Sequence, residues 1–505
     1  MWESGGQATH RSCALPENYS NPHVFLRFVI GSLIIVIAAA TATAVAAWHE
    51  VDKVVAAFKN TKHIPHINDV ISQADPGQPQ TILLMGSDKR SKNAIDVRRG
   101  LAGKPLSDTM MLVRLDPSKN ATAVLSLPRD LKVHIPRHGT DKLNAAYSLG
   151  GARLTVETIK DLTNLHINHV INVDFHGFSK AVNALGCIFV DVDRRYYNQS
   201  DAYSKIDIQP GYQRLCGQDS LAYVRYRHDD NDLVRARRQQ DFLREIKAQV
   251  GAFGLIDNRN KLLHIFSSYT SSDLNSRSGI LRLLRLGLFS ANHPIQEIRF
   301  RAKLGPSYVT ARPSVIHQVV RQFLGVKPAK GPTAVPVAGA KRKTGRHHAR
   351  RAVTGLVDSS AVGRDQALQA VNEKTHVFPV WYLAKNLPGA APEGSPTVYA
   401  ITTRSGRRYA AYRMVVRTNS IGTEYGLTSE YYGLQGTSYT DAPLLDQPHS
   451  TRRIRGRTFH VYHDGSRTRL VSWKTGDNVY WVSNTLLETL TNRQMLAIAA
   501  NTRHL

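Results

Sequence analysis

The stretch TILLMGSDKR, from Thr81 to Arg90, decides the fold because it joins an apolar strand directly to a group of charges. The same arrangement recurs in SDTMMLVRLD (107–116) and AVLSLPRD (123–130), and DKLNAAYSLGG places Lys142 just before a predicted helix. Apolar runs of this kind are typical of strands buried on both faces. Ligand sites of α/β sheets lie at strand ends, so the charged residues there are candidates for a functional site.

A second informative stretch is YVRYRHDDNDLVRARRQQ, from Tyr223 to Gln240. Its alternation predicts that Arg225 and Arg227 share one face of a strand. From Leu233 onward the pattern predicts a helix with three polar residues on one side: Arg235, Arg238 and Gln239. Guanidinium groups bind phosphate oxygens in a bidentate manner, so we expect a ligand with several anionic oxygens. The alternative is a solvated run of surface charges.

Two acids, Asp88 and Asp108, lie near predicted strand ends among many Lys and Arg residues. Their carboxylates favour a hard cation, Mg²⁺ (or Mn²⁺), that bridges carboxylate and phosphate oxygens. Either Asp taken alone fits a turn or helix N-cap equally well. No Walker loop, GxSxG, HExxH or CxxC motif occurs, which leaves P-loop, serine-hydrolase, zinc-protease and thioredoxin activities without support.

At these residues the chain resembles the LytR-CpsA-Psr family of cell-envelope phosphotransferases. The similarity covers roughly residues 79 to 325. It rests on the order and spacing of several motifs, namely GSDKR, SDTMMLVRLDP, LSLPRD, KLNAAY, INVDFHGFSKAVNALGCIFVDV and the arginine run. No single motif is decisive, but the set is specific.

The resemblance implies roles for the matching positions. Asp88 and Asp108 match the metal-binding acids of the family. The predicted pyrophosphate-binding residues are Arg90, Arg129, Lys142, Arg225, Arg227, Arg235, Arg238 and Gln239. The predicted catalytic residues are Asp88, Asp108, Arg129, Arg227 and Asp232, the last of which matches an acid placed beside the arginines. One departure is Leu106, where the family often has Arg; Lys104 is a candidate replacement for that charge.

The resemblance also implies an activity. Members of the family transfer a glycan polymer from a polyprenyl-pyrophosphate carrier to a peptidoglycan hydroxyl through a phosphodiester, outside the cytoplasmic membrane. The expected partners are therefore the lipid-linked glycan, peptidoglycan and membrane lipid, with no nucleic acid. Two alternatives remain open: a non-catalytic regulator that binds envelope polymer or lipid, and a nucleic-acid-binding transcription regulator.

An uncharged stretch from Phe28 to Trp48 is long enough to cross a bilayer. Because 27 residues precede it, we expect an uncleaved anchor rather than a signal peptide. Flanking charges give no clear orientation, and the resemblance and the cysteines favour a cytoplasmic N-terminus with the main domains outside. Cys13 precedes the anchor, whereas Cys187 and Cys216 follow it, which predicts an external disulfide between the latter two. Two unrelated buried cysteines are the alternative.

The net charge of +27 invites a nucleic-acid hypothesis. However, the stretch from Ile298 to Val357 contains 13 Lys and Arg and no acid, so about half of the excess is local. This stretch includes a Pro- and Ala-rich segment of the kind that forms linkers. In an external protein it would contact anionic lipid or wall polymer, or act only as a solubilising tether.

Apolar strands and amphipathic helices alternate over the matching region, which predicts an α/β/α fold with a mixed sheet. The last region is rich in strands and turns, which predicts a smaller α+β accessory domain with hairpins at Ser405-Gly406, Asp464-Gly465 and Gly476-Asp477. A final helix is expected to begin with Asn492 as its N-cap. The expected divisions are a cytoplasmic tail (1–27), an anchor (28–48), a juxtamembrane segment (49–78), a catalytic domain (79–325), a linker (326–374) and the accessory domain (375–505).

Overall fold

A computed structural model describes most of the chain after the predicted anchor. The described residues are 52–57, 59–75, 77–89, 105–119, 121–199, 205–226, 232–274, 276, 279–281, 295–300, 302–305, 307–325, 355–419 and 429–505. The predicted anchor, Phe28 to Trp48, lies outside them. Within the described part of the chain, no helix combines the length and apolarity needed to span a membrane.

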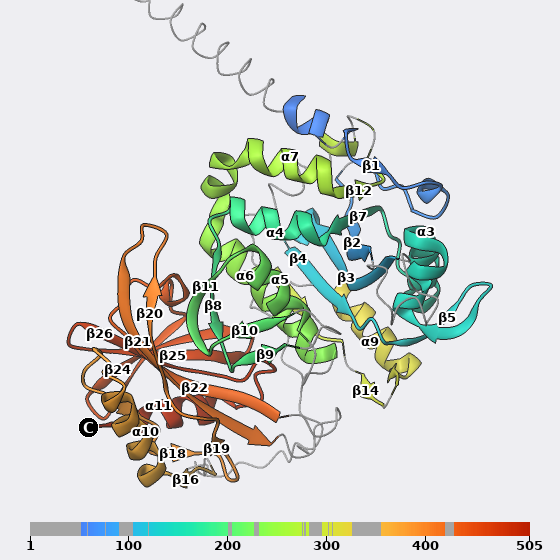
Figure 1. Cartoon of the computed structure of the whole chain (residues 1–505). Helices are drawn as coiled ribbons and strands as arrows, with labels where there is room; N and C mark the ends of the chain where they lie inside the picture. Colours follow the sequence, from blue (N-terminus) through green and yellow to red (C-terminus); the bar gives the residue numbers. More distant parts are fainter. Residues whose placement is uncertain are drawn as a thin grey trace, which may run out of the picture. The chain divides into compact units, whose positions relative to one another are not determined.

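A mixed seven-stranded sheet forms the centre of the first region (Figure 1). Its order is β1 (Lys62–His63), β12 (Thr270–Ser272), β7 (His169–Asp174), β2 (Gln80–Lys89), β3 (Pro105–Asp116), β4 (Ala121–Leu127) and β13 (Ile295–Ile298). The strands β2, β3 and β4, which match the three apolar runs of the sequence, pair in antiparallel fashion. The outer pairs β7–β2 and β13–β4 are parallel.

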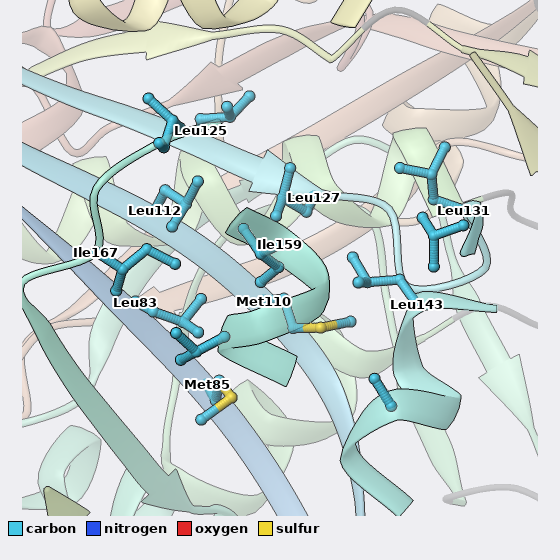
Figure 2. Packing of buried hydrophobic residues seen from close by; sticks show 14 of the residues in the cluster. Leu83, Met85, Met110, Leu112, Leu125, Leu127, Leu131, Leu143, Ile159 and Ile167 are labelled. Atoms are coloured by element: carbon cyan, nitrogen blue, oxygen red, sulfur yellow. The ribbon is translucent and has the colours of Figure 1, made fainter. Parts of the chain in front are cut away.

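One face of this sheet packs on α3 (Leu143–Thr163) and α9 (Pro313–Leu324). Figure 2 shows the core between them, where side chains of β2 to β4 meet Leu143 and Ile159 of α3. Two glycines, Gly150 and Gly151, have non-helical backbone angles and kink α3. Such kinks are expected at glycine pairs because glycine adopts conformations that other residues avoid.

The other side of the sheet carries α4 (Phe175–Ala184), α6 (Asp232–Asp257) and α7 (Arg259–Tyr269), with α5 (Gly217–Arg225) packed on α4 and α6. Two small antiparallel pairs extend this layer: β8 (Ile188–Val192) with β11 (Gly211–Leu215), and β9 (Tyr196–Asn198) with β10 (Ile206–Ile208). The three-layer α/β/α prediction with a mixed sheet is thus confirmed in its main lines.

The last region forms a second sheet with its own core (Figure 1). Its strands run in the order β19 (Ala391–Pro392), β21 (Arg408–Asn419), β22 (Ser429–Thr437), β26 (Asn478–Ser483), β25 (Arg467–Thr475), β24 (Arg457–Asp464) and β23 (Ser450–Ile454), and β20 (Thr397–Thr402) pairs with β21. The predicted hairpins β20–β21, β24–β25 and β25–β26 are all present. Two helices accompany the sheet, α10 (Ser360–Asn372) and α11 (Asn492–Ala500).

Short elements complete the two regions. They are the 3₁₀ turns η1 (Ile67–Asp69), η2 (Pro117–Lys119) and η3 (Pro443–Leu445), and the strand pairs β5 (Lys132–Ile135) with β6 (Gly139–Lys142), β14 (Lys303–Leu304) with β15 (Val309–Thr310), β16 (Val357–Asp358) with β18 (Lys385–Asn386), and β17 (Trp381–Tyr382) with β27 (Arg503–His504).

Several boundaries differ from the prediction. Strand β1 belongs to the central sheet, and Ile67 lies in its core, so part of the expected juxtamembrane segment is part of the fold. Likewise β16 and α10 lie within the expected linker, and Ala367 and Ala370 are buried in the second core. Sequence composition located the basic tract but could not show where packing resumes.

Two local predictions were wrong. Arg225 is the last residue of helix α5 rather than part of a strand. This helix begins after Cys216 and includes most of the segment for which a strand was predicted. The N-cap of α11 is Thr491, whose hydroxyl accepts a hydrogen bond from the Gln494 backbone N–H in a capping box. Asn492 instead accepts from the backbone N–H of Thr468 at 2.8 Å.

Candidate functional site

The backbone brings the two predicted metal-binding acids to the same end of the central sheet. Across β2 and β3, Gly86 pairs with Thr109 and Ser87 pairs with Ser107, which leaves Asp108 as the extra residue of a β-bulge. Asp88 pairs with Leu106, the position that departs from the family pattern. Bulges re-aim side chains and are common beside active sites. The side chains of Asp88 and Asp108 lie outside the described structure.

An aromatic ring packs against the strand beside this bulge. A side chain at Gly86 would meet a ring carbon of Phe175 and the Cβ of Thr109, each at 3.3 Å, so the glycine permits this close packing. The guanidinium carbon of Arg225 lies 4.1 Å from the centre of the same Phe175 ring. This cation–π contact holds Arg225 beside the strands that carry the two acids.

Gln239 joins three elements at this point. Its Nε2 donates to the hydroxyl of Thr109 in β3 at 3.0 Å and to the carbonyl of Val224 in α5 at 3.1 Å. Arg235 lies one helical turn earlier in α6 and is buried, with 4% of its surface exposed. Its spacing of four residues places it on the same helix face as Gln239. These contacts place Arg225 and Gln239 beside the bulge, and helical spacing places Arg235 on the same helix face as Gln239.

A second pair of predicted residues lies at the end of β4. Arg129 follows this strand and is buried; its Nε lies 3.7 Å from Oδ2 of Asp130. The ammonium of Lys142 lies 2.9 Å from Oδ1 of the same carboxylate. Because Leu127 pairs with Met110, Arg129 leaves the sheet at the end where Asp108 is located. The sequence motif PRD contains Asp130, but the pattern gave no indication that it links the two cations.

Arg238 serves a structural role, which corrects its predicted contact with pyrophosphate. The residue is fully buried, and its Nη1 donates to the carbonyls of Tyr223 at 3.2 Å and Tyr226 at 2.9 Å. Its guanidinium also lies 4.5 Å from the ring centre of Tyr196. Arg238 thus caps the C-terminal end of α5. Its helical spacing alone could not distinguish this inward position from a ligand contact.

For three of the predicted site residues, the side chain lies outside the described structure. Arg90 and Arg227 lie outside the described residues. Asp232 begins α6, but its side chain is not described. Their roles stay predictions.

The arginine run contains one residue whose role sequence analysis missed. Arg237, on α6, is buried and donates to three acids: Glu297 of β13, Asp464 of β24 and Glu488 near α11. Its distance to Glu488 is 2.9 Å. The helix that carries Gln239 is therefore bound by charge to the second region. No motif in the sequence links residues more than 200 positions apart, so only the fold reveals this network.

Two further arginines complete this ionic network. Arg244 of α6 lies 2.9 Å from both Asp464 and Asp241, and Arg299 lies 2.6 Å from Glu488. The acids of the network are Asp241, Glu297, Asp464 and Glu488, and the cations are Arg237, Arg244 and Arg299. Its carboxylates thus outnumber its guanidinium groups by one.

This imbalance sets the protonation of the network. Burial raises the pKa of Glu297 to about 7 and that of Glu488 to about 8. Burial alone would also raise the pKa of Asp464, but Arg237 and Arg244 outweigh it and lower that pKa. The excess carboxylate is thus neutralised by a proton on the Glu pair. Carboxylates of Asp241, Glu297 and Asp464 come close enough to hold a cation, but arginine donors already occupy their oxygens.

Apolar contacts reinforce the ionic network. Phe189 of β8 and Tyr212 of β11 share one hydrophobic cluster with Trp481 and Leu470 of the second sheet. The Tyr212 and Trp481 rings meet edge to face at 5.8 Å between centres. The β8–β11 pair and α6 thus contact the second region together.

Cys187 and Cys216 form a disulfide, with their Cα atoms 4.5 Å apart. The bond joins the residue before β8 to the residue before α5, so it fixes the layer from which Arg225 extends. The predicted pairing thus agrees with the structure.

Together, the central mixed sheet, the bulge and the cationic residues near it define an α/β/α protein with a candidate site at one end of the sheet. A model of the LytR_cpsA_psr family matches residues 42–315, more than half of the chain. The chain belongs to the LytR_cpsA_psr family.

Similar proteins include TagT of Bacillus subtilis (strain 168), a polyisoprenyl-teichoic acid–peptidoglycan teichoic acid transferase. It is 36% identical over 180 residues, which cover 35% of this chain and 54% of TagT. TagU of Oceanobacillus iheyensis, a transferase of the same name, is 30% identical over 235 residues, covering 44% of this chain and 69% of TagU. The chain thus matches about half of the length of the first of these relatives.

Solved structures also resemble the chain. The crystal structure of B. subtilis TagV is 27% identical, covers 50% of this chain and all of that one, and has a TM-score of 0.40. A structure of YwtF (TagT) with bound octaprenyl pyrophosphate lipid is 25% identical, covers 51% of this chain and 95% of that one, and has a TM-score of 0.36.

Proposed function

We propose that this protein is a membrane-anchored phosphotransferase that moves a glycan polymer from a polyprenyl-pyrophosphate carrier to a peptidoglycan hydroxyl. The observation that carries the proposal is the bond between Gln239 and Thr109, because it joins the arginine-bearing helix to the bulge that contains Asp108. The names of the transferase relatives support the same substrate class.

The proposed reaction is a phosphoryl transfer. The acceptor hydroxyl attacks the phosphorus attached to the glycan and forms one P–O bond, and the bond to the bridging pyrophosphate oxygen breaks. Polyprenyl monophosphate leaves, and the hydroxyl proton passes to a carboxylate or to water. Such reactions depend mainly on positioning and charge stabilisation, so a ring of guanidinium groups is well suited to the leaving phosphate.

The chain's own residues have distinct proposed roles. Arg225, Arg227, Arg235, Arg129 and Lys142 bind phosphate oxygens, and Gln239 orients the bulge. Asp88 and Asp108 would hold Mg²⁺ (or Mn²⁺), since carboxylate oxygens are the ligands that these hard cations prefer. When bound, the cation would supply charge neutralisation between the acids and the pyrophosphate. Asp232 is proposed to orient the acceptor hydroxyl.

We further propose that the protein is a single-pass protein of the cell membrane, with a cytoplasmic N-terminus and its main domains outside. The uncharged stretch from Phe28 to Trp48 and the Cys187–Cys216 bond support this location. A reporter fused to the C-terminus should be active only in its external form. Activity confined to a cytoplasmic reporter would contradict the orientation.

A transfer assay with site variants tests the proposed activity. The full chain, in detergent or vesicles, is supplied with a polyprenyl-pyrophosphate-linked oligosaccharide, a peptidoglycan fragment and Mg²⁺. We expect Arg225→Ala and Asp108→Asn to lower the transfer rate by 10²-fold or more, on the order found when a transition-state contact is removed. Arg364→Ala, an exposed position of α10, is the matched control. Equal rates in all four proteins, or binding of the lipid without transfer, would refute the catalytic assignment.

A further inference from the structure

The second region contains a cavity that the proposed transfer reaction does not use. It measures about 460 Å³ and lies where β17, β18, the β23–β24 turn and the end of α11 meet. This volume falls in the range of small-molecule sites, about 300–1,000 Å³. Its lining includes the polar or aromatic residues Ser360, Trp381, Lys385, Arg455, Arg457 and Arg503.

The lining of this cavity is strongly cationic. Four of the six residues are Lys or Arg, and none of the four forms a salt bridge within the described part of the chain. An acid beside the cavity is Asp358, which faces Lys385 across the β16–β18 pair. Its carboxylate accepts a hydrogen bond from the Ser360 hydroxyl at 2.6 Å, and that bond is the main reason why its pKa is lowered. Because four cationic side chains line the cavity beside this one carboxylate, the cavity carries a net positive charge.

Arg457 is the fixed cation of this cavity. Its guanidinium donates to the carbonyl of Ala500 at 2.9 Å and to the hydroxyl of Thr502 at 2.8 Å, at the end of α11. Neutral partners hold the group in place but leave its charge uncompensated. Burial, followed by the neighbouring charge of Arg455, lowers the pKa of Arg457, which is the direction expected for a cation without an anionic partner.

An indole ring forms part of the same wall. Trp381 is buried, lines the cavity and lies under Arg457, whose guanidinium carbon is 4.4 Å from the ring centre. The Nε1 of Trp381 is buried and has no hydrogen-bond partner among the described residues. Lys385, Arg455 and Arg503 are exposed around the opening.

We propose that this cavity binds a phosphate ester of a polyol or sugar. Guanidinium and ammonium groups would bind the phosphate, and the remaining volume and neutral donors would accommodate the hydroxylated part. Free phosphate monoesters and one unit of an anionic polymer share this chemistry. The inference does not depend on the transfer reaction, because the cavity lies in the second region and contains none of the residues assigned to transfer.

Calorimetric titration of the full chain tests this proposal. The probes are sn-glycerol 3-phosphate, inorganic phosphate, glycerol and a short poly(glycerol phosphate), all at constant ionic strength. We expect saturable binding of glycerol 3-phosphate, weaker binding of inorganic phosphate and no binding of glycerol. A tighter affinity for the polymer than for the monomer would identify a polymer unit as the ligand, and equal affinities would identify the free ester.

Two exposed cations allow a variant that should keep the fold. Lys385→Ala combined with Arg503→Ala is expected to weaken glycerol 3-phosphate binding by about 100-fold, which is tenfold for each charge-assisted contact. Arg493→Ala, an exposed position of α11 outside the cavity, should leave binding unchanged. Melting curves that coincide with the wild type would show that the variants are folded. The proposal is overturned if no probe binds, if the double variant binds normally, or if inorganic phosphate binds as tightly as glycerol 3-phosphate.

Discussion

At the scale of single residues, the arginine run divides into two functional groups. Gln239 binds Thr109 beside the bulge that contains Asp108, and Arg235 lies one turn earlier in the same helix, whereas Arg237 and Arg238 bind other groups of the protein. Residues of the same type, two or three positions apart, therefore do different work because successive positions of a helix point in different directions. Charge and spacing alone could not separate these groups.

Arg238 is expected to contribute to stability rather than to substrate binding. Arg238→Met removes donors from the carbonyls of Tyr223 and Tyr226 and leaves them buried. We expect the free energy of unfolding to fall by about 3 kcal/mol, measured by urea denaturation. Arg225→Ala should change stability by less than about 1 kcal/mol while reducing transfer. Unchanged stability of Arg238→Met would contradict the structural role.

Gln239 is expected to position the bulge. Gln239→Ala removes the bonds to Thr109 and Val224, so the bulge and the end of α5 lose their common anchor. We expect kcat for transfer to fall by about 10- to 100-fold with a smaller change in KM. The exposed Gln369→Ala of α10 is the matched control. Rescue by Gln239→Asn is not expected, because the shorter side chain cannot span both acceptors; full activity of either variant would rule out positioning.

At the scale of secondary-structure elements, helix α6 connects the candidate site with the second sheet. One side of it contacts β3 through Gln239, and Arg237 binds acids of β13, β24 and the segment before α11. The helix itself, the strands β2 to β4 and the late hairpins could be predicted because periodicity and turn residues are local signals. The network could not be predicted, since it depends on packing between distant segments.

Two variants distinguish the roles of the acids in this network. Asp464→Asn removes a carboxylate that receives donors from Arg237 and Arg244, so two buried cations lose their partner. We expect a loss of about 3 kcal/mol in the free energy of unfolding. Glu488→Gln imitates the protonated acid and should cost much less. Equal losses in the two variants, measured by chemical denaturation at pH 7, would show that the proton is not held by the Glu pair.

The same network predicts how stability depends on pH. The pKa values of Glu297 and Glu488, about 7 and about 8, lie above the ordinary value of 4.5. The folded state therefore binds more protons than the unfolded state at pH values between the ordinary and the raised pKa. The free energy of unfolding should therefore fall by several kcal/mol as pH rises from about 5 to 8. The pKa of Asp464 is lowered, so this carboxylate has the opposite effect. Its contribution to stability is lost only when acid protonates it.

Unfolding curves at pH 5.5 and pH 8 for the wild type and Glu488→Gln check this dependence. The wild type should lose more stability than the variant between the two values, since the variant lacks one of the titrating groups. A wild type that is more stable at pH 8 would reverse the predicted sign.

At the scale of the whole molecule, the described chain combines a catalytic-type α/β/α region with a second region that is joined to it by α6 and the β8–β11 pair. Sequence motifs were sufficient to place the two acids and Arg129 near strand ends, because the apolar runs mark where strands stop, and the strand register that brings these ends together came from the structure. They were insufficient for the second region, whose cavity is lined by residues of several elements far apart in the sequence. Its boundaries also required the structure, because packed residues extend into the segment expected to be a linker.

The central claim, transfer through a phosphodiester, is tested most directly by the chemical nature of the released lipid. The full chain is incubated with a polyprenyl-pyrophosphate-linked oligosaccharide and a peptidoglycan fragment, and both products are analysed by mass spectrometry. The account predicts one polyprenyl monophosphate released for each oligosaccharide joined to the fragment, with one phosphate retained in the new linkage. Release of polyprenyl pyrophosphate, with a product that contains no phosphorus, would contradict it.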